Sequence, residues 1–172
     1  MARHAWLGLA VVLVVVLQTA VFPVIPIYRA VPDLALVFAI LLGFLAGSRR
    51  GVAAALVAGG LLDLWSGRLI GLHLLLKGGA AYAGALVGRQ VYRDNAPIAF
   101  MCVAIASVAQ DVVVFIVIRL LGIPFPLYRA TYEVMLPALL YNLLLTPLIY
   151  LILYGLTDDL ASEEEIGRET AS

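Results

Sequence analysis

Asp63, His73 and Lys77 interrupt a nearly continuous apolar segment in the first half of the chain. Asp63, His73 and Lys77 lie within residues 59–88, which are otherwise mostly Leu, Ala and Gly. A charge inside lipid costs about 3 kcal/mol or more, so these side chains are expected to face a partner, a cavity or one another. They have the chemistry to bind a ligand or transfer a proton. A structural ion pair is the simpler use, because buried charges in membrane helices pair first and act only sometimes.

Lys77 needs a carboxylate partner, and the apolar helices offer two. Asp63 is the first choice, because it and Lys77 lie toward the outer half of adjacent helices joined by a short link, whereas Asp111 lies deeper along a later helix. Asn142 is placed to form a hydrogen bond across helices, worth about 0.6 kcal/mol. The candidate residues that face a partner or a ligand are Asp63, His73, Lys77, Asp111 and Asn142.

The sequence argues against catalysis. It contains no HExxH, GxSxG or P-loop motif, and two histidines do not suffice for a histidine metal site. Cys102 is the only cysteine, which excludes an intrachain disulfide and a cysteine metal cluster. The formal net charge is zero and the basic residues are scattered, unlike a nucleic-acid-binding surface. We predict a protein that is not an enzyme and has no catalytic residues, no cofactor and no metal.

The elements that position these residues are apolar helices. Hydrophobic residues make up 64% of the chain, against roughly 45–50% in soluble domains, so we predict an all-α integral membrane protein with about six transmembrane helices. The second and third segments reach only about 21 Å, so they either span a thinned region or form a re-entrant hairpin. The six segments are Ala5–Phe22, Leu34–Gly47, Gly51–Leu64, Leu69–Gly88, Pro97–Leu121 and Thr131–Leu156.

The two ends of the chain are expected on the same side of the membrane, because the number of spans is even whether or not the short pair crosses. Arg49 and Arg50 in a tight turn favour the cytoplasm for that side. Residues 157–172 are rich in Asp and Glu and predict a disordered acidic cytoplasmic tail. The domain prediction is therefore a helical bundle over residues 1–156 followed by this tail.

Small residues recur at intervals of four in the two helices that carry the charges. Such stripes let helix backbones approach closely, and van der Waals contact then drives association in lipid. The glycines expected to pack helices together are Gly59, Gly60, Gly67, Gly71 and Gly84.

The order and spacing of several short motifs resemble the MreD family, integral membrane proteins of the bacterial cell-elongation machinery. The resemblance extends to about Leu156 and leaves out the acidic tail. The matching features are Gln18, Pro32-Asp33-Leu34, Gly51, Gly60-Leu61-Leu62-Asp63-x-x-Ser66-Gly67, Gly71-Leu72-His73, Gly79-x-x-Tyr82-x-Gly84 and Tyr141-Asn142-x-x-x-Thr146-Pro147.

The resemblance implies a non-enzymatic scaffold of the bacterial cytoplasmic membrane that supports cell shape and peptidoglycan synthesis. Its implied partner is MreC, which links it to RodA and a class-B transpeptidase, with MreB beneath the membrane. Membrane lipid surrounds it, and nucleic acid is not a partner.

The alternative function comes from a distant similarity of that family to the S components of energy-coupling-factor vitamin transporters. That fold has six helices around an outward pocket, so it implies binding of a small molecule or lipid. Many S components carry an AxxxA stripe on their first helix for docking the energising subunit, and Ala5–Phe22 has no such pair. Convergence of Asp63, His73 and Lys77 on one cavity would favour this alternative.

Overall fold

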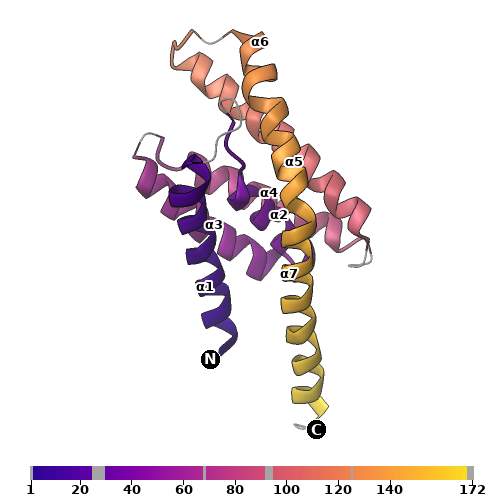
Figure 1. The fold of residues 1–172 in the computed structure, drawn as a ribbon. Coiled ribbons are helices and arrows are strands. Elements are labelled where there is room, and N and C mark those ends of the chain that lie inside the picture. Colours follow the sequence, from indigo (N-terminus) through magenta and orange to yellow (C-terminus); the bar gives the residue numbers. More distant parts are fainter. Residues whose placement is uncertain (1, 25–29, 68, 92–94, 125, 170–172) are drawn as a thin grey trace.

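A computed structural model describes residues 2–24, 30–67, 69–91, 95–124 and 126–169, which form helices joined by short turns (Figure 1). Each of the six apolar segments predicted from the sequence corresponds to one helix, with shifted ends, so the all-α prediction is confirmed. These helices are α1 (Ala2–Val16), α2 (Leu34–Ala46), α3 (Ser48–Ser66), α4 (Leu72–Gly88), α5 (Ala96–Leu120) and α7 (Leu136–Glu169).

Short helical pieces extend two of the long helices. After α1 the chain continues through a π-helical turn, η1 (Leu17–Val21), and a 3-10 turn, η2 (Phe22–Val24). Before α7 lie the single turn α6 (Leu127–Arg129) and a second π-helical segment, η3 (Ala130–Met135). A π-helical turn rotates the side chains that follow it, and such turns are frequent at functional sites.

The helix α2 forms the centre of the molecule. Every residue from Leu34 to Leu45 is buried, and α2 packs against α3, α4, α5 and α7. A helix that is apolar on all sides is expected in such a central position, because no face of it favours water. At 13 residues it is about 20 Å long, shorter than the roughly 30 Å hydrocarbon core of a bilayer.

Among the described residues, three stretches are long and apolar enough to cross a membrane by length and composition. They are Trp6–Val24, Ala96–Leu120 and Leu127–Thr157. The helices Leu34–Ala46 and Leu72–Gly88 are apolar but shorter. This confirms the short helix predicted at Leu34–Gly47. The segment Gly51–Leu64, also predicted to be short, instead forms the 19-residue helix α3. The start of α1 and the end of α7 lie at the same end of the bundle (Figure 1).

The acidic C-terminal segment differs from its prediction. The backbone of α7 runs as a helix to Glu169, past residue 156, where the sequence predicts the start of a disordered tail. Glu, Leu, Ala and Arg in this segment are good helix formers, and a helix that is already nucleated extends at little cost.

Glycines bring α2, α3 and α4 into backbone contact. A Cβ atom at Gly84 would overlap the carbonyl oxygen of Ile40 on α2, and one at Gly59 would lie 2.6 Å from the carbonyl oxygen of His73 on α4. Gly60 has only an ordinary contact, with a Leu74 side-chain atom 3.6 Å from the Cβ position. Gly59 and Gly84 are therefore packing glycines, as predicted from their spacing.

Gly67 and Gly71 correct the prediction that they pack helices together. Each has open space where a Cβ atom would lie, and their φ angles are +61° and +96°. Gly67 ends α3 in the left-handed conformation and Gly71 precedes α4. Both glycines are needed for the turn between the two helices, because L-residues rarely adopt positive φ.

Candidate functional site

The polar side chains at the centre of the molecule form one connected group around Lys77. The ammonium of Lys77 is fully buried, forms an ion pair with Asp33 Oδ2, and donates a hydrogen bond to Gln110 Oε1 at 2.6 Å. Gln110 Nε2 donates to the same Asp33 oxygen at 2.7 Å. A buried charge is tolerated when it is paired and its hydrogen bonds are satisfied, which this triangle achieves.

Asp33 is in this place because it starts the central helix. It is the N-cap of α2, and its Oδ1 accepts a hydrogen bond from the backbone N–H of Leu36 at 2.9 Å. Its backbone N–H donates to Asn142 Oδ1 at 2.8 Å, and Asn142 Nδ2 donates to Ser107 Oγ at 3.0 Å. We call Asp33, Lys77, Gln110, Asn142 and Ser107 the Lys77 cluster; it connects α2, α4, α5 and α7.

Gln18 attaches the first helix to the same point. It lies in the π-helical turn η1, and its Nε2 donates to the carbonyl oxygen of Pro32 at 3.0 Å. Its Oε1 accepts from the N–H of Ala35 at 3.4 Å. The loop and first turn around Asp33 are therefore held from both sides, by Gln18 and by Asn142.

The predicted partner of Lys77 was wrong: its carboxylate is Asp33 rather than Asp63. The Asp63 carboxylate is 2% exposed and accepts three backbone N–H groups, from Gly71 at 2.9 Å and from His73 and Leu74 at 3.0 Å each. These are donors at the start of α4, which have no partner within their own helix. Asp63 is thus a cap for α4 supplied by α3.

The cap predicts the effect of changing Asp63. In Asp63→Asn one acceptor oxygen becomes an amide that cannot accept, so at least one of the three N–H groups loses its partner. We expect a loss of about 1–3 kcal/mol in the free energy of unfolding, measured as a lower melting temperature in detergent. Ser66→Ala removes a hydroxyl at the end of α3 that donates to the carbonyl oxygen of Asp63 at 3.2 Å. It should lower the melting temperature less than Asp63→Asn, because it leaves none of the three N–H groups at the start of α4 without a partner. Equal melting temperatures for Asp63→Asn and the unchanged protein would contradict the cap.

Asp111 was predicted to face a partner or ligand, and its neighbour Gln110 was not. The structure shows that Gln110 belongs to the Lys77 cluster. The Asp111 side chain is half-buried and makes no hydrogen bond or ion pair with another described residue. Ser107 and Gln110 are three residues apart on α5 and reach the cluster together. Residues three and four apart both share a face of a helix, so the sequence places Gln110 beside Ser107 as readily as it places Asp111 there. Only the packing of α5 shows that Gln110 faces the cluster.

His73 faces a small cavity of about 230 Å³. The cavity is lined by Asp33, Gln18 and Trp65 among others, and the His73 Nδ1 atom is buried without a hydrogen-bond partner among the described residues. Neither Asp63 nor Lys77 lines it. Asp63, His73 and Lys77 therefore do not converge on one cavity.

The polar groups of this arrangement hold neighbouring helices together. Each charged or amide group of the Lys77 cluster is engaged by a group from another helix. Within the described part of the chain, no three His, Cys, Asp or Glu residues lie close enough to hold a metal ion.

Comparison with known proteins gives one match. The model of the family described as rod shape-determining protein MreD matches residues 3–159. Searches of curated proteins and of solved structures found no match. The matched range contains the whole Lys77 cluster and the cap formed by Asp63.

Proposed function

Because this chain belongs to the MreD family of rod shape-determining proteins, we propose that it is a non-enzymatic membrane scaffold of the cell-elongation complex. Its family gives it a role in rod-shape determination and, with its apolar helices, a place in the membrane. The proposed direct partner is MreC. Through MreC the scaffold would reach RodA and a class-B transpeptidase, with MreB beneath the membrane, and so support peptidoglycan synthesis.

The family match carries the proposal, since it covers every helix from α1 into α7. The Lys77 cluster supports it. Its polar groups are used in bonds between helices, which is what a protein that must hold a fixed shape for partners requires. The long helices also expose many large apolar side chains, such as Leu144 at 73% and Leu75 at 71%, to lipid or to partner helices.

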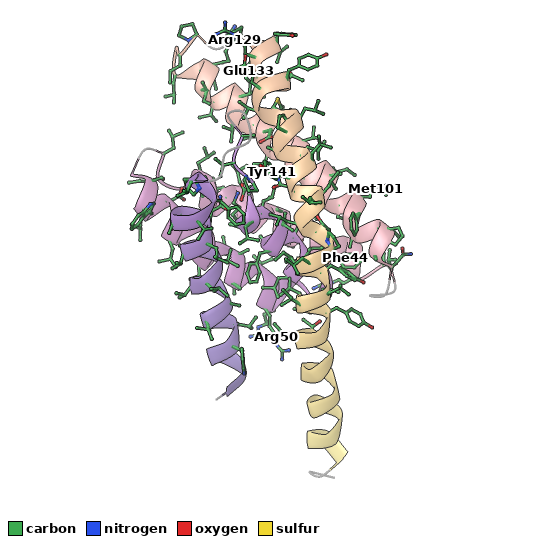
Figure 2. All side chains as sticks on the ribbon, viewed as in Figure 1. Phe44, Arg50, Met101, Arg129, Glu133 and Tyr141 are labelled. Carbon is green, nitrogen blue, oxygen red and sulfur yellow. The ribbon has the colours of Figure 1, made fainter. Side chains whose placement is uncertain are left out.

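The proposed orientation places both chain ends in the cytoplasm. It is supported by the start of α1 and the end of α7 lying at one end of the bundle, where Arg50 also lies (Figure 2). Arg and Lys next to membrane helices favour the cytoplasmic side. A reporter fused to the C-terminus should be active only in the cytoplasm, and periplasmic activity would contradict this orientation.

The observation that would favour the alternative function, convergence of Asp63, His73 and Lys77 on one cavity, is not found. Of these three residues, only His73 lines the cavity of about 230 Å³. The similarity to S components of vitamin transporters stays a prediction.

The proposal predicts a cell-shape defect and a specific complex. Depletion of the protein from its rod-shaped host should make the cells round, and re-expression should restore rods. A tag on this protein should capture MreC from detergent-solubilised membranes. A similarly tagged, unrelated multi-span protein is the control. Depleted cells that stay rod-shaped with normal wall incorporation, or equal MreC capture by the control, would contradict the scaffold role.

A further inference from the structure

A large groove lies between α1 and α3, on the side of α3 away from the cap formed by Asp63. Its volume is about 800 Å³, within the roughly 300–1,000 Å³ of ligand sites. Small side chains on both helices, Gly8 on α1 and Ala53 and Ala54 on α3, leave the space open. A Cβ atom at Gly8 would meet nothing within 4 Å.

The walls of the groove have two chemically different parts. Arg49 and Arg50, in the first turn of α3, line one end, and both are exposed. The remaining lining residues are apolar, and two of them, Val12 and Val57, are more than half exposed. Charge is thus confined to one end of an otherwise apolar groove.

The length of the apolar part matches one leaflet of a membrane. Leu61 is the last groove residue on α3, eleven residues after Arg50. At 1.5 Å per residue this is about 16 Å along the helix. Half of the hydrocarbon core of a bilayer is about 15 Å. A chain whose polar group lies at the arginines would therefore end near the middle of the membrane.

We propose that this groove binds an anionic phospholipid of the leaflet that faces the two chain ends. The phosphate lies at Arg49 and Arg50, and an acyl chain lies along Val12, Val57 and Leu61. Guanidinium groups bind phosphate oxygens in pairs, and the unpaired N–H groups of the first turn of α3 add positive potential. Basic pockets between membrane helices are a recurring form of anionic lipid site.

Arg49 supplies the first contact to the phosphate in this proposal. Its guanidinium makes no hydrogen bond or ion pair with a described residue, whereas Arg50 has a further interaction within the protein. Arg50 adds positive charge at the same end. Lipid binding in this groove is independent of whether MreC is the partner of the protein.

Native mass spectrometry of the full chain in neutral detergent tests the charged end. The protein is titrated with phosphatidylglycerol and with phosphatidylcholine that carry the same acyl chains. We expect phosphatidylglycerol to bind at lower concentration. At about fivefold for each arginine near a membrane surface, Arg49→Gln with Arg50→Gln should weaken phosphatidylglycerol binding roughly 25-fold. The double variant Arg119→Gln with Arg129→Gln has the same charge change at the opposite end and should keep the affinity.

A second variant tests the apolar part without touching a charge. Gly8→Leu places a side chain in the open groove and should weaken binding of both lipids, while it leaves the preference for phosphatidylglycerol unchanged. This variant also decides the test if the arginine variant does not fold. Equal binding of the two lipids by the unchanged protein, equal losses in the two arginine variants, or full affinity in Gly8→Leu would each overturn the proposal.

Discussion

Lys77→Met is expected to destabilise the protein by about 3 kcal/mol, the low end of what breaking a buried ion pair costs. The change leaves the Asp33 carboxylate, at the start of the central helix, without its buried cation. Asp33→Asn should cost a similar amount for the opposite reason, because the Lys77 ammonium is then orphaned. Asn keeps an oxygen for the N–H of Leu36, so the cap of α2 is retained. The readout is the melting temperature in detergent.

The double variant Lys77→Met with Asp33→Asn should recover much of that loss, because neither charge is then left alone. The matched control is the solvent-accessible pair Arg129–Glu133, in which Arg129 Nε lies 3.8 Å from Glu133 Oε1. It lies at the opposite end of the bundle from Arg50 (Figure 2). Its coupling energy should be below about 1 kcal/mol, as for other surface pairs. Strictly additive losses for Lys77 and Asp33 would mean that they do not stabilise each other.

The second large effect is expected at Gly84→Leu, which should prevent α4 from packing on α2. A Cβ atom there would overlap the Ile40 carbonyl oxygen, and the reciprocal position Gly43 would overlap the Ala81 carbonyl oxygen. The obstacles are backbone atoms, which cannot rotate away. Overpacking costs about 1–3 kcal/mol or more. Here it would also move Lys77, on α4, away from its partner Asp33 at the start of α2.

Gly79→Ala is the control for this prediction, with the opposite sign. Gly79 is on the same helix, and a Cβ atom there would meet nothing within 4 Å. Because Ala forms helix better than Gly by about 1 kcal/mol, Gly79→Ala should be neutral or slightly stabilising. The measurement is again the melting temperature in detergent. Destabilisation of both variants to the same degree would show that contact with α2 is not the cause.

The helices could be predicted from the sequence because their signals are local. Each apolar run predicts a helix, and the absence of a polar face over Leu34–Ala46 is typical of a helix at the centre of a bundle. The start of α2 also has a local signal, since an Asp after Pro32 and before an apolar run is a typical N-cap. The spacing of small residues likewise indicated that Gly59 and Gly84 touch neighbouring helices.

The ion pair could not be predicted because its partners are 44 residues apart and are brought together only by packing of α2 on α4. Asp33 lies just before a helix, so it is not among the carboxylates within the apolar helices. Asp63 was within reach of Lys77 by helix spacing, but it is used by the free N–H groups of α4. Those groups are invisible in a sequence, since they follow from where one helix starts next to another.

The measurement that tests the account most directly is rod shape and MreC capture in cells that carry only the double variant Lys77→Met with Asp33→Asn. In the proposed scaffold the Lys77 cluster has a structural role, since it joins α2, α4, α5 and α7. We therefore expect the double variant, once its melting temperature is recovered, to capture MreC and maintain rods, and Lys77→Met alone to do neither well. A stable double variant that gives round cells and captures no MreC would contradict the account, and would mark Lys77 and Asp33 as residues that act directly in the function.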